Sequence, residues 1–268
     1  FLSAAALMIG AIGFAQNNTS TTNQTGNDND AFVQQVGNLN MANNDQTGDD
    51  NESKSTVNGD DNTVDIDQIG NNNFVKANSI LSGNSFYADK NNMTAFQEGN
   101  GNYLKFRNTG GDDNNLESNQ NGNNNFLRLD VRGDNNNFTS DVDGNSNRGS
   151  WRVTSGYPPS ADNNNVDLVQ AGDGNYSTGR IDGSNNNVTA SQTGNGNRIG
   201  TSWYTTDGVK ITGDANTADI LQNGDLNKAY SLQNGNNNMN SITQTGESHV
   251  STVNQIGNGN IATTIQSN

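Results

Sequence analysis

The phrase Gln-x-Gly-x-x-Asn returns at a spacing of eleven residues through most of this chain. A copy at Gln244 carries His249 in place of the Asn, and complete copies begin at Gln24, Gln35, Gln46, Gln68, Gln97, Gln120, Gln170, Gln192, Gln222, Gln233 and Gln255. Repetition at a short, fixed period is typical of arrays in which each small unit is buried only by stacking on its neighbours. The sequence therefore predicts one repetitive domain over residues 24–268, preceded by a linker at 16–23.

The composition alone would favour a disordered chain. Only 29% of the residues are hydrophobic and 6% are aromatic, which is too little for a thick core. The period excludes disorder, because a disordered chain has no reason to keep Gly and Asn in phase. Most of the 31 glycines lie at one phase of the repeat, which predicts turns with positive φ.

Between the Asn of one phrase and the Gln of the next, apolar side chains occupy alternate positions. Val64 and Ile66 precede Gln68 in this way. Alternation with a period of two predicts a strand with one buried face, on which the Asn, two apolar residues and the Gln point inward. A right-handed helical coil of eleven-residue period is excluded, because one Gly and several Asn in each unit would break the helix.

Labelling the units alternately reveals a second period of twenty-two residues. The Gln positions of the first set are Gln24, Gln46, Gln68, Gln97, Gln120, Val142, Gln170, Gln192, Gln222, Gln244 and Gln266. The second set is often aliphatic and reads Gln35, Val57, Leu81, Asn108, Val131, Pro159 (a poor fit), Ile181, Ile211, Gln233 and Gln255. This difference predicts a rung of strand, turn, strand and turn, in which like residues stack.

The predicted fold is thus an all-β solenoid of about ten rungs with two stacked parallel sheets. Rungs at cross-β spacing lie about 4.8 Å apart, so the Gln amides of the first set should form a hydrogen-bonded ladder. The turns are expected to be formed by Gly26 with Asn29, Gly48 with Asn51, Gly70 with Asn73, Gly172 with Asn175, Gly194 with Asn197, and Gly257 with Asn260.

The spacing stretches to 13 residues between Gln68 and Leu81, to 16 before Gln97, to 17 between Val142 and Pro159, and to 19 between Gln192 and Ile211. These insertions are interpreted as loops. The two longest each follow a Gln-rich strand and should emerge at one edge, about two rungs apart. Their aromatic residues, Trp151 with Tyr157 and Trp203 with Tyr204, would form a contact patch for a partner or cover the base of their own loop.

The charges and the rare residue types exclude several functions. A net charge of −15 argues against binding to nucleic acid or an anionic membrane, and the 13 Lys and Arg are scattered without a run. The chain has no Cys, and the lone His249 occupies a turn position, so no disulfide, redox site, His metal site or hydrolytic triad is expected. We predict no enzyme activity and no cofactor.

Several turns are acidic, as in Gly48-Asp49-Asp50-Asn51. They are similar to calcium-binding loops, but the Gly-Gly-x-Gly-x-Asp nonapeptide of calcium β-rolls is absent and the period differs. Asp49 and Asp50 are followed one rung later by Asn71 and Asn72. The acidic turns are therefore interpreted as solubilising charges that alternate with Asn turns to limit repulsion.

The first fifteen residues are apolar and end in Gly13, Phe14 and Ala15. They resemble the hydrophobic region and cleavage site of a secretory signal peptide, and they are short for a membrane anchor. The expected mature chain is exported and begins near Gln16.

The repeat resembles the curlin repeat of bacterial curli amyloid subunits, Ser-x5-Gln-x-Gly-x-Gly-Asn-x-Ala-x3-Gln. The best fits begin at Gln97, Gln170, Gln192 and Gln255, and the last one runs through Gly259, Asn260 and Ala262 to Gln266. The second Gly is usually Asn or Asp here, and the Ser is irregular. The resemblance implies an extracellular subunit that passes through a curli-type outer-membrane secretion channel and polymerises into biofilm fibres for adhesion and aggregation, started by a nucleator subunit.

Three classes of function are therefore compared. The leading hypothesis is a fibre subunit that docks end to end, because the repeat continues to Gln266 without an irregular unit that would cap it. The alternative is a monomeric β-solenoid adhesin that binds a ligand through its aromatic loops. An ice-binding solenoid would need flat Thr ladders, and Thr is too irregular here.

Overall fold

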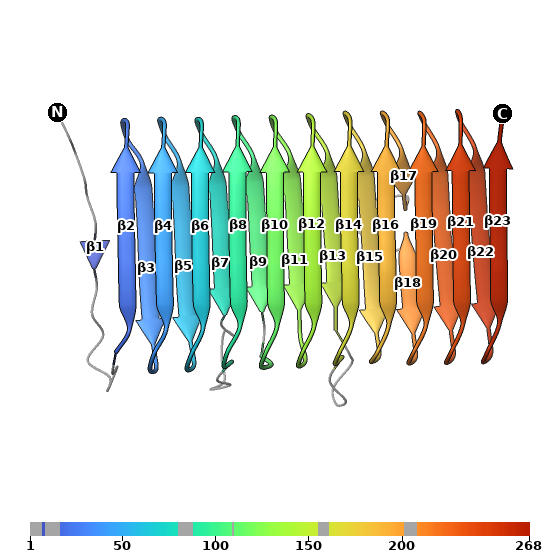
Figure 1. The fold of residues 1–268 in the computed structure, drawn as a ribbon, viewed down its shortest axis with the longest axis horizontal. Coiled ribbons are helices and arrows are strands. Elements are labelled where there is room, and N and C mark those ends of the chain that lie inside the picture. Colours follow the sequence, from blue (N-terminus) through green and yellow to red (C-terminus); the bar gives the residue numbers. More distant parts are fainter. Residues whose placement is uncertain (1–6, 9–16, 80–87, 109, 155–160, 201–207) are drawn as a thin grey trace.

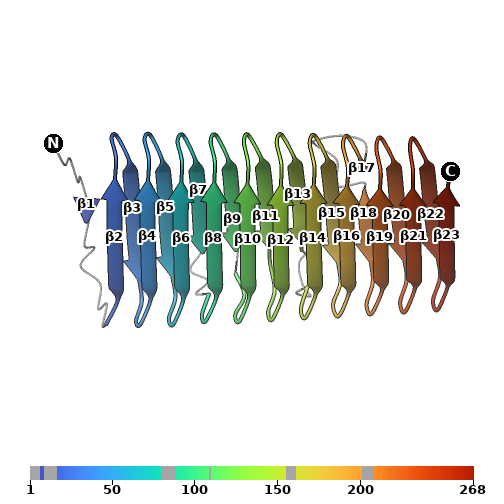
Figure 2. The same cartoon turned by 45° about the horizontal axis from the view of Figure 1, so that its top comes forward.

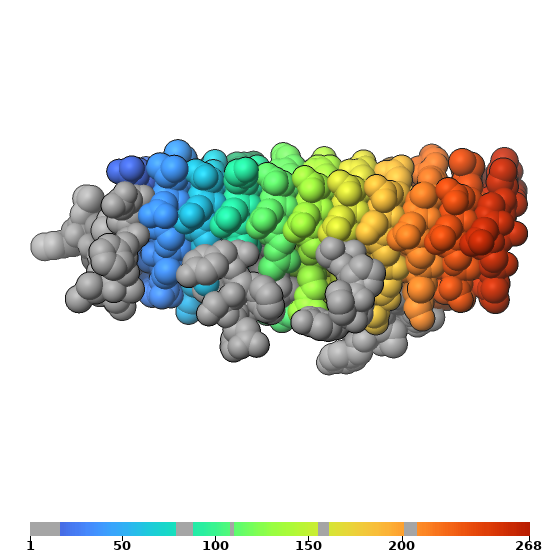
Figure 3. Space-filling view, turned by 90° about the horizontal axis from the view of Figure 1, so that it is seen from below, coloured from blue at the N-terminus to red at the C-terminus, as the bar shows by residue number. Residues whose placement is uncertain are grey.

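The computed structural model describes residues 7–8, 17–79, 88–108, 110–154, 161–200 and 208–268. In these residues the chain forms 23 strands and no helix. The strands lie side by side in chain order along one straight rod (Figures 1 and 2). A space-filling view shows the same order along the surface, from the N-terminal rungs at one end to the C-terminal rungs at the other (Figure 3).

Two parallel sheets share the strands alternately. Sheet 1 contains β2 (Thr19–Thr25), β4 (Met41–Thr47), β6 (Thr63–Ile69), β8 (Asn92–Glu98), β10 (Asn115–Asn121), β12 (Asn137–Asp143), β14 (Asn165–Ala171), β16 (Asn187–Thr193), β19 (Thr217–Asn223), β21 (Met239–Thr245) and β23 (Ile261–Ser267). Sheet 2 contains β1 (Leu7–Met8), β3 (Asp30–Val36), β5 (Glu52–Asn58), β7 (Phe74–Ser79), β9 (Tyr103–Asn108), β11 (Phe126–Val131), β13 (Arg148–Val153), β15 (Tyr176–Asp182), β17 (Arg198–Ile199), β18 (Val209–Thr212), β20 (Lys228–Asn234) and β22 (Val250–Ile256).

Each strand pairs with the strand of the next rung in its own sheet, so one rung contributes one strand to each sheet. The exception is the rung in which two short strands, β17 and β18, both lie between β15 and β20. In the regular part Gln24 lies beside Gln46, and Gln46 beside Gln68, which is the expected step of twenty-two residues. The prediction of a β-solenoid with two stacked parallel sheets is confirmed. The first strand of sheet 1 begins at Thr19, so it takes up part of the segment 16–23 that was expected to be a linker.

Two members of the second set were wrong. The residue that pairs with Val57 is Ser79 and not Leu81, and the residue that pairs with Val131 is Val153 and not Pro159. The eleven-residue count continues unbroken through β7 and β13, because their inward positions keep the apolar phase. The extra residues come after these strands, and Leu81 and Pro159 lie outside the described residues.

The core is a narrow column between the two sheets. The alternating residues that were expected to point inward are fully buried, among them Val64, Ile66, Leu127 and Leu129. The hydrophobic cluster extends from Val57 to Val253 along the rod. Complete burial of one such side chain contributes about 1.5–3 kcal/mol, so stacking many rungs compensates for the small core of each.

Candidate functional site: the amide ladders and turns

The glutamines of sheet 1 form a ladder that runs along the rod. The Nε2 of each donates to the Oε1 of the next at 2.7–3.0 Å, first from Gln24 through Gln46, Gln68 and Gln97 to Gln120, and again from Gln170 through Gln192, Gln222 and Gln244 to Gln266. From Gln46 onward, Nε2 also donates to the first carbonyl of the preceding strand of sheet 2, as from Gln192 to Tyr176 O at 3.1 Å. The ladder therefore fixes the register within sheet 1 and ties it to sheet 2.

Val142 interrupts this ladder. It is 1% exposed and lies between Gln120 and Gln170 in the stack. The Oε1 of Gln170 is buried and has no hydrogen-bond partner among the described residues. Gln233 Oε1 is left in the same state in sheet 2, where Ile211 precedes it in the stack.

A second set of ladders runs along the turns. The backbone N–H of Asn51 donates to Asn29 Oδ1 at 3.1 Å, and Asn51 Nδ2 donates to Gly70 O at 2.7 Å. Most other Asn of the turns repeat this bond to the next glycine carbonyl, including Asn29, Asn73, Asn175 and Asn197. Asn260 donates instead to Asn238 Oδ1 at 2.9 Å.

His249 takes the place of one such Asn. Its backbone N–H donates to Asn227 Oδ1 at 3.0 Å, as an Asn there would. Its ring Nε2 lies 3.1 Å from Thr245 O in its own turn. The backbone contact of the ladder is therefore kept without the amide side chain.

The glycines of the turns are required by the neighbouring rung as well as by their own conformation. Gly26, Gly48, Gly70, Gly172, Gly194 and Gly257 have φ between 107° and 118°. A Cβ built on Gly172 would lie 2.2 Å from Gly194 O, and the same approach recurs through the stack except at Gly257, in the last turn. Each turn therefore rests directly on the backbone of the next.

Acidic turn residues stack differently at the two edges. Where the chain passes from sheet 1 to sheet 2, Asp49 alternates with Asn27 and Asn71 as expected, and its Oδ1 accepts a bond from the Asn27 N–H at 2.8 Å. At the opposite edge the expected alternation is wrong, because five carboxylates follow one another: Asp60, Asp89, Asp112, Asp134 and Asp162. Each of the last four accepts a bond of 2.7–2.9 Å from the backbone N–H of the Asp before it, and such charge-assisted bonds offset the repulsion.

Trp151 is not in a contact loop. It lies at an inward position of β13, is 1% exposed, and packs edge to face on Phe138 with ring centroids 6.2 Å apart. Its Nε1 donates to Ser177 Oγ at 3.2 Å, and a Cβ on Gly179 would collide with its ring. Its indole therefore fills the core space that Gly179 leaves empty one rung later.

The expectation that both aromatic insertions follow a Gln-rich strand is also wrong. Residues 155–160 follow β13 of sheet 2, and residues 201–207 fall between β17 and β18 within sheet 2. Tyr157, Trp203 and Tyr204 lie outside the described residues.

The described part of the chain has neither a helix long and apolar enough to cross a membrane nor a cluster of three His, Cys, Asp or Glu suited to a metal ion. What it presents is a periodic surface of paired amides and backbone groups. Such a surface binds another copy of the same edge better than it binds a small molecule.

Comparison with known proteins agrees with this geometry. No curated protein matches the chain. Residues 161–194, which include β14 to β16, and residues 213–246, which include β19 to β21, each match the family model of the curlin associated repeat. These two stretches of the rod therefore carry the curlin associated repeat.

Proposed function

We propose that the chain is a secreted structural subunit that assembles end to end into extracellular curli-like amyloid fibres of a biofilm matrix, where the fibres serve adhesion and aggregation. One observation carries the assembly step. Inward-facing residues are buried in most strands of sheet 1, but in β2 and β23 at the two ends of the described rod they are only half-buried. A second copy docked on either end would complete their burial.

The direction of the ladder favours head-to-tail docking. Every Gln–Gln bond of sheet 1 is donated by Nε2 toward the C-terminal end, from the Gln24 bond at 2.7 Å to the Gln244 bond at 2.8 Å. A copy whose β2 pairs with β23 of the preceding copy would offer Gln24 Oε1 to Gln266 Nε2. Repeated head-to-tail contacts that do not close into a ring generate a filament, so the fibre would be polar.

Export and nucleation are further parts of the proposal. They rest on the curlin match and on the apolar segment 1–15, which resembles a signal peptide. We propose passage through a curli-type outer-membrane channel and initiation by a separate nucleator subunit. The adhesin alternative is not favoured, because Trp151, one of its four proposed contact residues, is buried.

Placing a carboxylate on the inward face of the end rung tests end-to-end docking. In the free chain Ala262 is half-buried, so Ala262→Asp should be tolerated, but docking would bury the charge without a partner. We expect elongation on wild-type seeds, followed by thioflavin fluorescence and electron microscopy, to be abolished. The matched control is Thr263→Asp, the adjacent outward residue, which should elongate like wild type.

Circular dichroism of the soluble variants checks that both keep the β structure. Elongation of folded Ala262→Asp at the wild-type rate would contradict the docking mode. A wild-type chain that stays monomeric for days, even with sonicated seeds, would contradict the fibre function itself.

A further inference from the structure

The outward faces of the two sheets carry opposite charges. Of the 13 Lys and Arg, all but Lys90 and Arg132 lie in strands of sheet 2: Lys54, Lys76, Lys105, Arg107, Arg128, Arg148, Arg152, Arg180, Arg198, Lys210 and Lys228. Their side chains alternate with buried residues and therefore point outward. The strands of sheet 1 contain no Lys or Arg but nine carboxylates: Asp45, Asp65, Asp67, Glu98, Glu117, Asp141, Asp143, Asp167 and Asp219. The scatter of basic residues along the sequence thus becomes one basic face in the fold.

The basic face is only partly neutralised by its own carboxylates. Its strands contain four, and the most buried of them is Asp130, which lies 2.5 Å from Arg128, 3.5 Å from Arg107 and 3.7 Å from Arg152. Three guanidinium groups thus share one carboxylate, and the side chains of Arg107 and Arg152 remain 42% exposed. Burial lowers the pKa of Lys105, and the positive charges of Arg128 and Lys76 lower it further.

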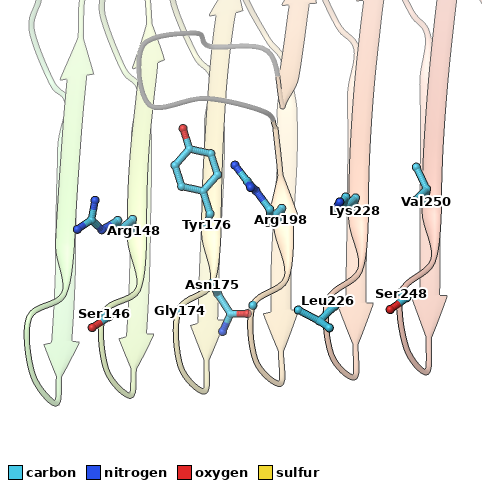
Figure 4. Close-up of a pocket in the computed structure, with 11 residues that line it drawn as sticks. Ser146, Arg148, Gly174, Asn175, Tyr176, Arg198, Leu226, Lys228, Ser248 and Val250 are labelled. Atoms are coloured by element: carbon cyan, nitrogen blue, oxygen red, sulfur yellow. The ribbon is translucent and has the colours of Figure 1, made fainter.

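One margin of the basic face is hollowed into a groove of about 660 Å³. Arg148, Tyr176, Arg198 and Lys228 line it from successive rungs, as Figure 4 shows. The Arg198 guanidinium lies over the Tyr176 ring, 5.3 Å from its centroid. Farther along the same row, Phe74, Tyr103 and Phe126 stack with ring centroids 4.8 Å apart. This row is therefore aromatic in the N-terminal rungs and mostly cationic in the C-terminal rungs.

The acidic face has the converse electrostatic strain. Burial raises the pKa of Asp67, and the neighbouring charges of Asp45 and Asp65 raise it further. Asp141 is affected in the same way by burial and then by Asp143 and Asp167. Positive charge brought against this face would relieve the repulsion.

We propose that two copies pack side by side, with the basic face of sheet 2 of one copy against the acidic face of sheet 1 of its neighbour. Both faces repeat with the spacing of the same rungs, so opposite charges can meet along most of the rod. The basic residues extend from β5 to β20 and the acidic residues from β4 to β19, which are matching lengths. One exposed ion pair contributes little, but many in register form a network, and sheets stacked face to face lie about 10 Å apart. The lateral contact goes beyond the proposed function and, for fibres, rests on it.

Salt and charge reversal test this contact. We expect wild-type fibres to form bundles at about 10 mM salt, where the Debye length is about 30 Å, and to separate at about 1 M, where it is about 3 Å. The double variant Lys210→Glu/Lys228→Glu, at two exposed positions of the basic face, should elongate like wild type yet form single fibres at low salt. The charge-matched control is Lys90→Glu/Arg132→Glu, whose two residues lie in turns, and it should still bundle.

A complementary mixture sharpens the test. Fibres of Asp65→Lys/Asp219→Lys should not bundle alone but should bundle with fibres of the Lys210→Glu/Lys228→Glu variant. Bundles that resist both salt and charge reversal would overturn the proposal. So would wild-type fibres that stay single at low salt yet bind heparin, because the basic face would then take a polyanion in place of a second copy.

The same samples separate this proposal from the fibre function. Single fibres that elongate without bundling contradict only the lateral contact. If no fibres form, the fibre function fails, and sedimentation equilibrium of the soluble chain at the two salt concentrations then tests whether the faces associate. Association that is lost at high salt and in the Lys210→Glu/Lys228→Glu variant supports the lateral contact, and its absence at low salt overturns it.

Discussion

A buried primary amide is most stable where both its hydrogens and its oxygen find partners, and Gln192 shows how the solenoid provides them. Its Nε2 donates to Gln222 Oε1 and Tyr176 O, its Oε1 accepts from Gln170 Nε2, and it is completely buried. A slip of one residue would leave all these groups unpaired, at a cost of about 1–3 kcal/mol for each. The glutamines thus fix the register in which successive strands pair, and they do not form a reactive site.

Closing the gap in the ladder should stabilise the chain. In Val142→Gln, the new amide can donate to the orphan Gln170 Oε1 and accept from Gln120 Nε2. We expect the free energy of unfolding to rise by about 1 kcal/mol, the net value of an added buried hydrogen bond. Chemical denaturation of the monomer measures it.

Val188→Gln is the matched control for this prediction. Val188 is equally buried in sheet 1, but its stacking neighbours are Val166 and Ala218, which offer no amide. The same substitution should there destabilise the chain by about 1–3 kcal/mol. Equal effects at the two sites would show that the amide ladder contributes nothing specific.

At the scale of the elements, each turn has two positions with different requirements, one for close approach to the next rung and one for a left-handed φ. The first position, as in Gly172, usually has a positive φ and approaches the carbonyl of the next rung, where a Cβ would collide. Ala88 and Ala161, which follow two of the insertions, take this position without a positive φ. The position two residues later has a left-handed φ of about 60°, and Asn, Asp, Ser and Gly all occur in it. At Gly174 and Gly259 it faces open space.

Two substitutions in one turn should distinguish these two requirements. Gly172→Ala should cost more than about 1 kcal/mol, because its φ of 107° is strained for Ala and its Cβ would meet Gly194 O. Gly174→Asn should change the stability by less than about 0.5 kcal/mol, since Asn tolerates its φ of 65° and no atom lies within 4 Å. Thermal unfolding followed by circular dichroism measures the stability of both variants. An equal loss of stability at both sites would refute the distinction between the two positions.

The elements differ in how far the sequence alone could predict them. Strict alternation, as at Val64 and Ile66, sufficed for the strands and for the stacking of the first set. The insertions were misplaced because their apolar residues, such as Leu81, imitate the phase of a strand. Trp151 was assigned to a loop because its neighbours suggested one, although the eleven-residue count already placed it inward. The basic face was missed although the signal was present, since it appears once the charges are sorted by alternate strands.

The whole molecule is a rod whose net charge of −15 opposes its own assembly. Burial and neighbouring carboxylates raise the pKa of Asp67 and Asp141 above the ordinary value of 3.8. Because their pKa values are higher in the folded state than in the unfolded chain, their charged forms lower the stability at neutral pH. That cost disappears as the pH falls through the raised pKa values.

Fibre growth should therefore accelerate as the pH falls from 7 toward about 4, and also as salt rises. Elongation on seeds measures the rate, and the double variant Asp67→Asn/Asp141→Asn should respond less to pH than wild type. Growth rates independent of both pH and salt would contradict the idea that charge repulsion slows fibre growth. The bundling inferred above has the opposite dependence on salt, so the two kinds of contact can be separated in one titration.

The interruption at Val142 also bears on how such a rod would break. Strands lie across the long axis and their hydrogen bonds lie along it, so tension on the ends would be shared by all bonds between two successive rungs and transmitted unchanged from rung to rung. The rod would then be as strong as its least connected junction. Between β10 and β14 the side-chain bonds of the Gln ladder are missing while the backbone pairing continues, so a stretched fibre should rupture there first.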